Sequence, residues 1–231
     1  MDPWFDSNLV WRALPIVVEY LPVTLTIFFY SSLIGLLFGL CLAIFRVYNI
    51  CILHTLSVVL VSYARGTPVL VQLILLYYLL PIFLISLGVD INAVPALYFV
   101  IAANGLYLSA NFCEVFRSAL GNVDRGQIEA AYSIGMKNRQ VFCRVMMPQA
   151  VMLAIPDMSN IFLVALKSTA LAFTVGVMDV MGRGITLSAQ TMRSFEVFLS
   201  ISIIYFILCS GMERIFKLVE RKFSFHRRYP K

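Results

Sequence analysis

Five long apolar segments, separated by polar stretches, dominate the pattern of this chain. They cover residues 21–45, 68–87, 96–116, 151–175 and 195–212. A helix needs about 20 mainly apolar residues to cross the hydrocarbon core of a bilayer, which is roughly 30 Å thick. The pattern therefore predicts an all-α integral membrane protein with five transmembrane helices.

The second span is the last part of a longer apolar region, residues 52–87. As one straight helix it would measure about 54 Å, which is too long for a simple crossing. The motif Arg65-Gly66-Thr67-Pro68 predicts a break, with Thr67 as the N-cap of the next helix and Pro68 as its first residue.

The remaining segments are shorter. Residues 3–15 predict an interfacial helix that carries Trp4 and Trp11 on one face. Residues 47–53, 88–95 and 176–193 are expected to be connecting loops, and residues 213–231 a basic tail.

Composition agrees with a membrane protein. The 231 residues are 61% hydrophobic and 13% charged, and the mean hydropathy is +0.88. We expect one domain over residues 1–231, with its core at about 20–215. The net charge of +6 is better explained by membrane topology than by nucleic-acid binding, because the basic residues lie in loops and at the carboxyl end. Asp2 and Asp6, with no basic residue before the first apolar run, argue against a cleaved signal peptide.

The basic residues also predict an orientation. Thirteen Lys and Arg fall on the side that holds the segment 117–148 and the carboxyl terminus, and three fall on the other side. The positive-inside rule then places that segment and the carboxyl terminus in the cytoplasm and the amino terminus outside.

The polar segment at about 118–148 predicts two short helices that meet at a glycine. Asp124 and Gln127 form a capping-box pattern that would start a helix through Glu129, and Gly135 would end it. A second helix would stop before Pro148 and carry an apolar stripe of Val141, Phe142, Val145 and Met146.

The first of these helices suits a docking role. Ala130 and Ala131 remove side-chain bulk, so the helix can lie close to another surface, and Glu129 offers a charge to a partner. The alternative is an amphipathic loop that lies on the inner leaflet.

The five cysteines have no C-x-x-C spacing, so they indicate neither a zinc site nor a disulfide framework. They are Cys41, Cys51, Cys113, Cys143 and Cys209. We expect them to pack as apolar residues.

The pattern of Glu129-Ala130-Ala131, three residues, Gly135, nine residues and Val145-Met146-Met147-Pro148 resembles the EAA loop of binding-protein-dependent ABC importer permeases. Val145 and Met147 replace the isoleucine and leucine of the family pattern. The resemblance implies that Gln127, Glu129, Ala130, Ala131, Gly135 and Pro148 couple the chain to an ATPase.

Further segments, together covering about residues 20–215, resemble the polar amino acid branch of these permeases. They include the Arg65 motif with Val71-Gln72-Leu73, Glu114-Val115-Phe116-Arg117, Pro148-Gln149-Ala150 and Leu166-Lys167-Ser168-Thr169. The chain departs from the pattern at Lys137, where Asn138 would take the cap, and at Asn111 and Ser168. Residues 170–182 look most like the permeases assigned to cystine.

The resemblance implies a type I importer fold in a bacterial inner membrane. It implies a second permease, identical or a sister chain, two cytoplasmic ATPase subunits, an external substrate-binding protein and surrounding lipid as partners, and transport by alternating access. The chain has no Walker A pattern. We therefore expect a transport subunit rather than an enzyme, with no cofactor and no metal of its own, and with ATP bound by the partner.

Polar residues inside the spans are candidates for a solute pathway, because such residues usually face a bundle interior or a cavity. A zwitterionic amino acid needs donors for its carboxylate and acceptors for its ammonium group. We expect Lys167 with Ser168 to contact the carboxylate, and Asn104, Asn160 or Gln72 the amino end. The candidate set is Thr67, Gln72, Asn104, Asn160, Lys167, Ser168 and Thr169.

The alternative for this set is that its members bond to one another and hold the helices together. Arg65 is expected to anchor or brace the inner edge, and Glu114 with Arg117 to form an ion pair on one helix.

Two other classes of function compete. A transporter driven by an ion gradient would need inverted repeats or buried acids, and Asp157 is the acid well inside the fourth span. An intramembrane enzyme would need a nucleophile beside His54 or His226, and the sequence pattern indicates none.

Overall fold

The computed structural model describes residues 5–224, and that part of the chain contains helices and no strand. Five helical stretches are long and apolar enough to cross a membrane. They are Leu21–Val47, Val69–Ser86, Ala96–Gly121, Asn138–Val175 and Ser194–Lys222. The predicted set of five spans is confirmed. Trp4, Asp2, His226 and the end of the basic tail lie outside the described residues.

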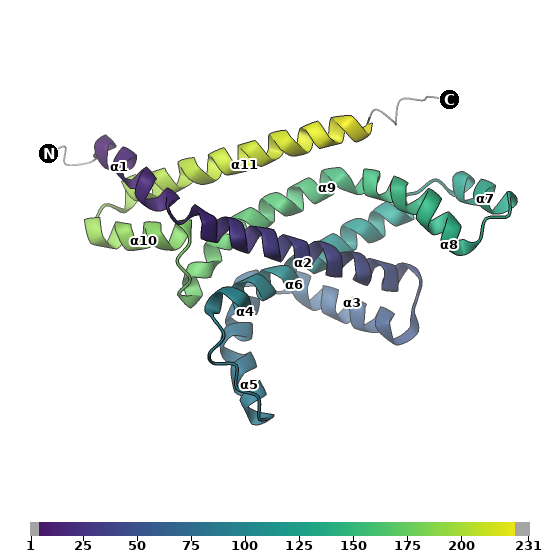
Figure 1. The fold of residues 1–231 in the computed structure, drawn as a ribbon, viewed down its shortest axis with the longest axis horizontal. Helices are drawn as coiled ribbons and strands as arrows, with labels where there is room; N and C mark the ends of the chain where they lie inside the picture. Colours follow the sequence, from purple (N-terminus) through teal and green to yellow (C-terminus); the bar gives the residue numbers. More distant parts are fainter. Residues whose placement is uncertain (1–4, 225–231) are drawn as a thin grey trace.

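The helices pack side by side into an elongated bundle (Figure 1). In order they are α1 (Ser7–Val18), α2 (Leu21–Val47), α3 (Cys51–Gly66), α4 (Val69–Ile74), the π-helical turn η1 (Leu75–Leu79), α5 (Leu80–Ser86), α6 (Ala96–Gly121), α7 (Arg125–Ser133), α8 (Asn138–Val141), the π-helical turn η2 (Phe142–Met146), α9 (Met147–Ser168), the 3₁₀ segment η3 (Thr169–Val175), α10 (Val180–Thr191) and α11 (Ser194–Ser224).

Helices α2 and α6 form the closest pair in the bundle, because glycines bring their backbones together. A Cβ atom at Gly35 would lie 2.6 Å from Leu108 Cβ, and one at Gly39 would lie 2.6 Å from Phe112 Cβ. Small residues at helix contacts are the usual means of close packing in membranes. Around this pair, α3 and α9 complete the main apolar core.

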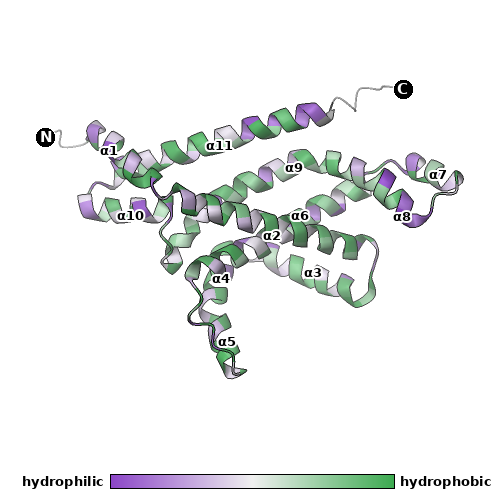
Figure 2. Cartoon of the chain, in the orientation of Figure 1, coloured by the Kyte–Doolittle hydropathy of each residue, from purple (hydrophilic) through white to green (hydrophobic). Residues whose placement is uncertain are grey.

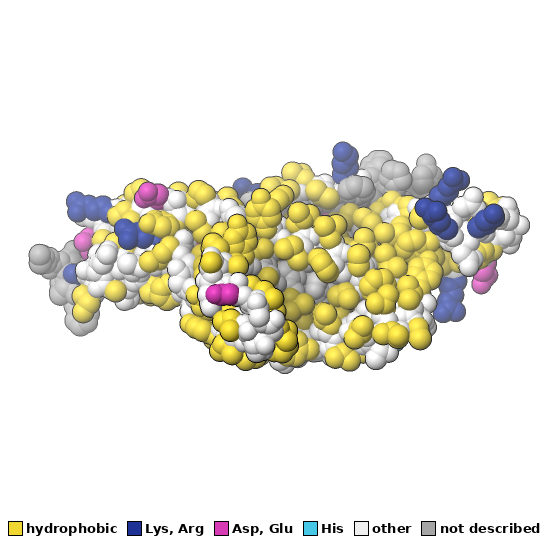
Figure 3. Space-filling model, turned by 60° about the horizontal axis from the view of Figure 1, so that its bottom comes forward, with side chains coloured by type: hydrophobic (Ala, Val, Ile, Leu, Met, Phe, Trp, Pro, Cys, Tyr) yellow, Lys and Arg dark blue, Asp and Glu magenta, His cyan; other side chains and the backbone are white. Residues whose placement is uncertain are grey.

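A second apolar cluster joins α1, α10 and α11 at the end of the bundle opposite α7 and α8 (Figure 1). Polar residues concentrate in α7, α8, α10 and the end of α11 (Figure 2). On the face drawn in Figure 3, the Lys and Arg side chains gather at the two ends, and the middle is mostly apolar. This distribution suits a protein that spans a membrane along its long axis.

The break at Arg65-Gly66-Thr67-Pro68 is confirmed, but its capping differs from the prediction. Thr67 ends α3, and its hydroxyl donates to the Tyr63 carbonyl oxygen (2.9 Å). Pro68 occupies the N-cap position of α4 and is not a helical residue. Thr67 Oγ1 accepts its hydrogen bond from the Gln72 side chain (2.9 Å) and not from a backbone N–H of α4. After the break, the arm of α4, η1 and α5 leaves the bundle at an angle (Figure 1).

Three connections differ from the sequence prediction. The linker after α2 is shorter, residues 48–50. Residues 176–193 are not a simple loop, because Asp179 caps helix α10 within them. The fifth span continues through much of the predicted basic tail, as α11 reaches Ser224. In both α10 and the end of α11, the chain is helical where polar residues had predicted a loop or a tail.

Candidate functional site

The polar segment at about 118–148, called the coupling segment below after its predicted role, begins with a capped helix. Asp124 Oδ1 accepts a hydrogen bond from the backbone N–H of Gln127 (3.1 Å), as predicted. The other half of the predicted capping box is wrong, because the Gln127 side chain bonds elsewhere. Its Oε1 accepts a hydrogen bond from Gln149 Nε2 (2.6 Å), which ties α7 to the first turn of α9.

Gly135 ends this helix, as predicted. Its φ of +81° lies in the left-handed region, which favours glycine. The N–H of Gly135 donates to the Tyr132 carbonyl (2.9 Å) and that of Met136 to the Ala131 carbonyl (3.2 Å). This is the Schellman arrangement, which satisfies the last carbonyls of the helix. It fixes the angle at which the chain turns toward α8.

The two alanines of α7 face opposite environments. Ala131 is buried, whereas Glu129 and Ala130 are exposed. The expectation that both alanines leave room for another surface to approach the helix therefore fits the exposed Ala130 only. Sequence reasoning did not single out Tyr132 and Ile134, which are exposed on the same short helix and its cap; Ile134 is 79% exposed. The elbow formed by α7 and α8 thus presents an apolar edge as well as the Glu129 carboxylate.

The second loop helix does not stop before Pro148. Helix α8 continues through η2 directly into α9, and Pro148 lies in the first turn of α9. Pro148 directly follows the π-helical turn, in which the Met147 N–H donates to the Phe142 carbonyl five residues back, so its missing N–H falls where the regular α-helical bonding is already interrupted. The predicted cap at Asn138 is also wrong: Lys137 takes that position, and its N–H donates to Gln140 Oε1 (2.8 Å).

The elbow also contacts the linker between α2 and α3. The rings of Tyr48 and Phe142 meet edge to face with centroids 5.4 Å apart. Burial raises the pKa of the Tyr48 hydroxyl above its usual value. The coupling segment therefore contacts the α2–α3 linker as well as the two spans that it connects.

Glu114 is the centre of a charged cluster. Its Oε2 accepts from Arg117 Nε (3.0 Å) and Nη2 (2.9 Å), so the predicted ion pair is confirmed. Sequence reasoning missed Arg46 of α2, which donates to Glu114 Oε1. Arg65 Nη1 lies 3.9 Å from the same oxygen. The cluster joins α2, α3 and α6 within the membrane-spanning part of the fold.

Gln72 spans the break between α3 and α4. Its Nε2 donates to the carbonyl of Ala64 (2.8 Å), the carbonyl of Thr67 (3.1 Å) and Thr67 Oγ1 (2.9 Å). Gln72 Oε1 and Asn104 Nδ2 are buried and have no protein partner among the described residues. The structure joins Thr67 to Gln72 by a hydrogen bond and shows no hydrogen bond from Asn104 to either of them.

The candidates on α9 and η3 divide between two environments. Asn160 and Lys167 are seven residues apart on the exposed face of α9. Ser168 and Thr169 are buried and donate to the carbonyls of Ala165 (2.9 Å) and Leu166 (2.8 Å). Lys167 is exposed and the neighbouring Ser168 is buried, so the two side chains point in different directions; their contact with a solute carboxylate stays a prediction.

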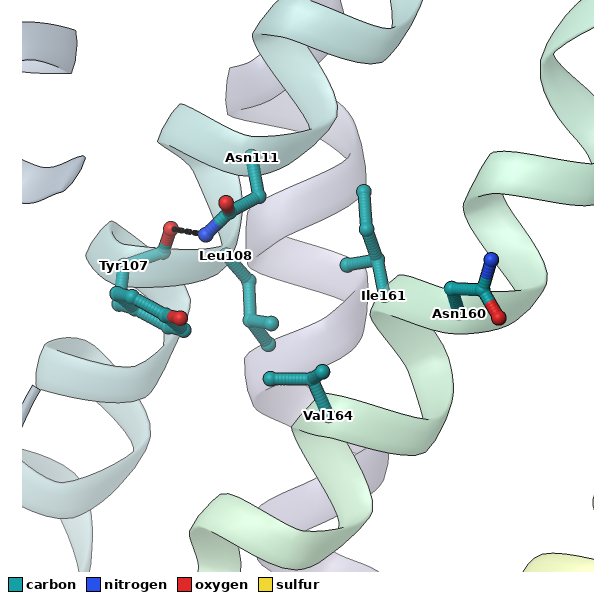
Figure 4. Close-up of a pocket in the computed structure, with 6 residues that line it drawn as sticks. All are labelled: Tyr107, Leu108, Asn111, Asn160, Ile161 and Val164. Carbon is teal, nitrogen blue, oxygen red and sulfur yellow. Dashed lines mark hydrogen bonds between the residues drawn. The ribbon is translucent and has the colours of Figure 1, made fainter.

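A small pocket lies between α6 and α9 (Figure 4). Its volume is about 120 Å³, and its lining is Tyr107, Leu108, Asn111, Asn160, Ile161 and Val164. Asn111 Nδ2 donates to the Tyr107 carbonyl (2.9 Å), and the Asn160 amide points away from Asn111 (Figure 4). Asn111, which the sequence marked only as a departure from the family pattern, is the polar side chain that α6 contributes.

Asp179 was also missed. It is fully buried at the start of α10, where Oδ1 accepts from the Gly182 N–H (2.8 Å) and Oδ2 has no partner among the described residues. Burial raises the pKa of its carboxyl group. The next residue, Val180, donates its N–H to Thr24 Oγ1 of α2 (3.2 Å). No short sequence motif links Thr24 to a residue 156 positions away.

Metal-ligand geometry is absent from residues 5–224: no three His, Cys, Asp or Glu side chains there form a group that could hold an ion. The five cysteines are free thiols in this structure.

Comparison with known proteins adds to this geometry. Residues 34–225 match the family described as "Binding-protein-dependent transport system inner membrane component". The chain is 40% identical to the L-cystine transport system permease protein TcyL of Bacillus subtilis (strain 168), over 96% of this chain and 93% of that one. It is 31% identical to the L-cystine transport system permease protein TcyB of the same organism, over 88% and 83%.

A solved structure has the same fold. "Crystal structure of an amino acid ABC transporter with histidines" superposes with a TM-score of 0.83 at 31% identity, covering 94% of this chain and 99% of that one. The chain therefore belongs to the binding-protein-dependent transport system inner membrane component family, as the permease subunit of an amino acid ABC importer.

Proposed function

We propose that this permease carries L-cystine. Two relatives with that substrate in their names, TcyL and TcyB, support the proposal. The segment at 170–182, whose sequence resembles cystine permeases, forms η3 and the capped start of α10. It directly follows Lys167 and Ser168 at the end of α9. Sequence differences between permeases in this segment can therefore change the contacts of a solute that lies against α9.

We assign the solute-facing surface to the exposed face of α9 and the adjoining stripe of α6. Asn160 and Lys167 lie on the first, and Asn111 on the second. An exposed lysine within a span is costly against lipid, so Lys167 is expected to face a water-filled path. Gln72 bonds to the Ala64 carbonyl of α3, and Thr169 Oγ1 lies 3.4 Å from the Tyr205 hydroxyl of α11, so we assign these two to holding helices together. The hydroxyls of Thr67 and Ser168 donate to carbonyls of their own helices, and we assign them to the helix ends.

The small size of the pocket supports a site shared with a second permease. Ligand pockets are commonly about 300–1,000 Å³, whereas the pocket beside Asn111 measures about 120 Å³. One chain therefore supplies a partial wall. We propose that a second permease, identical or a sister chain, supplies the opposite wall.

We propose that the elbow of α7 and α8 docks onto an ATPase subunit, with two such subunits serving two permeases. The exposed Glu129 and Ala130 and the apolar edge of Tyr132 and Ile134 support this contact. In this arrangement the elbow faces the cytoplasm, and the amino terminus faces the outside, where a substrate-binding protein delivers the solute.

The test is uptake of labelled L-cystine by proteoliposomes that hold this chain, its ATPase and its binding protein. We expect uptake that requires ATP, that falls at least tenfold in the Glu129→Ala/Gly135→Pro double variant, and that falls in Lys167→Met. Lys222→Met, at the exposed end of α11, is the matched control. ATP-dependent uptake of another amino acid and not of cystine would overturn the substrate, and uptake indifferent to ATP would overturn the mechanism.

A further inference from the structure

The charged cluster at Glu114 contains more positive than negative charge. Arg46, Arg65 and Arg117 surround one carboxylate, so two positive charges remain uncompensated among these four side chains. The four residues come from α2, α3 and α6, and Glu114 lies seven residues before the end of α6. Arg46 and Arg117 lie near the ends of α2 and α6 on the side of the α7 elbow, and arginines without an acidic partner there keep N–H donors available to an anion.

The three arginines do not share the carboxylate equally. Arg46 occupies Oε1 and Arg117 occupies Oε2, whereas Arg65 stays 3.9 Å away. The side chain of Arg65 is 51% exposed and that of Arg117 is 45% exposed, against 17% for Arg46. Two guanidinium groups therefore keep free N–H donors on an open surface.

The acid of α9, Asp157, does not compensate the cluster. It lines a neighbouring hollow of about 330 Å³ with Val115 and Ser118. Among the ion pairs of residues 5–224, none includes Asp157. An anion from outside the chain would remove the imbalance.

The cluster also lies in line with the pocket. Tyr107, Asn111, Glu114 and Ser118 follow one another at spacings of four, three and four residues, so they form one stripe along α6. Each is half-buried or exposed. Glu114 lies one turn from Asn111 in the direction of the α7 elbow. A solute that left the Asn111 pocket toward the elbow would meet the arginines next.

We propose that Arg65 and Arg117 form a carboxylate-binding station of the permease, on the elbow side of the Asn111 pocket, with Glu114 and Arg46 holding them in place. The planar guanidinium group presents paired N–H donors that match a carboxylate. The free carboxylate of the transported amino acid is the occupant. This inference rests on the proposed pathway along α6 and α9.

The experiment uses the complete importer in proteoliposomes and the amino acid that the wild-type protein transports, with cystine as the first probe. We expect Arg65→Gln and Arg117→Gln to lower the kcat/KM of uptake by about 10-fold to 100-fold, because each removes a charge-assisted interaction. Arg65→Lys should recover part of the loss. Lys217→Gln, which removes an exposed lysine of α11, is the control and should leave uptake unchanged.

Two further measurements separate a carboxylate station from a lipid headgroup site. The decarboxylated analogue, cystamine for cystine, should inhibit uptake by the wild type and by Arg65→Gln equally, because it lacks the group that Arg65 binds. Equal uptake by the wild type and both glutamine variants would overturn the station. A loss that occurs in phosphatidylglycerol vesicles and not in phosphatidylcholine vesicles would overturn it in favour of a lipid headgroup site. If the wild type does not transport cystine, only the proposed substrate is wrong. The wild type and the Arg65→Gln variant are then compared with the amino acid that is transported and with its decarboxylated analogue.

Discussion

Gln149 donates a hydrogen bond from Nε2 to Gln127 Oε1 over 2.6 Å, between side chains 22 positions apart in the chain. This contact fixes α7 against the first turn of α9. In the proposed docking, a displacement of α7 by the ATPase would therefore reach the span that carries Asn160 and Lys167 without passing through Gly135 and α8. The contact gives the coupling segment a second mechanical connection to the bundle, beside the covalent one through α8.

Replacing Gln149 by Met should weaken coupling while leaving the fold intact. Met keeps a similar length and removes the hydrogen bond, whose net contribution is about 1 kcal/mol. We expect fewer solute molecules transported per ATP hydrolysed. Ser133→Ala removes an exposed bond within α7 itself and is the control. An unchanged ratio of uptake to ATP hydrolysis in Gln149→Met would show that the hydrogen bond between Gln149 and Gln127 does not contribute to coupling.

Gly135→Ala should strain the elbow. A Cβ atom would meet nothing within 4 Å, so the cost comes from the backbone φ of +81° alone, about 1 kcal/mol. Gly121→Ala, also free of contacts but without a positive φ, should be neutral or slightly stabilising. We expect ATP hydrolysis stimulated by the binding protein to fall in the first variant and not in the second. Equal behaviour of the two would contradict a role for the Schellman turn.

The predictable features are those that local sequence encodes. The spans follow from runs of apolar residues, and the caps at Asp124 and Gly135 follow from residues within four positions of the helix ends. The pair of Glu114 and Arg117 was found for the same reason, since helix geometry places residues three apart together.

The features that were missed depend on contacts between distant segments. Arg46 meets Glu114 across 68 positions, and Val180 bonds to Thr24 across 156. The different exposure of Lys167 and Ser168 also depends on which face of α9 packs against the bundle, and the sequence pattern did not indicate that face. The continuous helix through Pro148 was missed because a proline usually ends the helix that precedes it, and the sequence pattern did not indicate the π-helical turn before it.

Asp179→Asn should remove a pH dependence of stability. Burial raises the pKa of the Asp179 carboxyl above its ordinary value, so the folded state binds its proton more tightly than the unfolded state. The resulting stability is full below the unfolded pKa and is lost as the pH rises through the folded pKa. Asn keeps an oxygen to accept the Gly182 N–H.

Thermal unfolding in detergent from pH 4 to pH 8 is the measurement for Asp179. We expect the wild type to lose stability toward pH 8 relative to Asp179→Asn. Asp179→Ala, which also loses the helix cap, should be less stable than Asn at every pH by about 1 kcal/mol. Parallel curves for the wild type and the Asn variant would mean that the carboxyl group has an ordinary pKa in the folded protein.

Gly39→Ala tests the closest helix contact. The added Cβ would lie 2.6 Å from Phe112 Cβ and 2.8 Å from the Ser109 carbonyl oxygen, and a backbone atom cannot move aside as a flexible side chain can. The helices must separate, at a cost of about 1–3 kcal/mol, so the melting temperature in detergent should fall by several degrees. Gly211→Ala, in α11 with no atom within 4 Å, should not lower it, because alanine favours the helix over glycine. If both variants melt with the wild type, α2 and α6 do not pack as closely in the folded protein as these distances require.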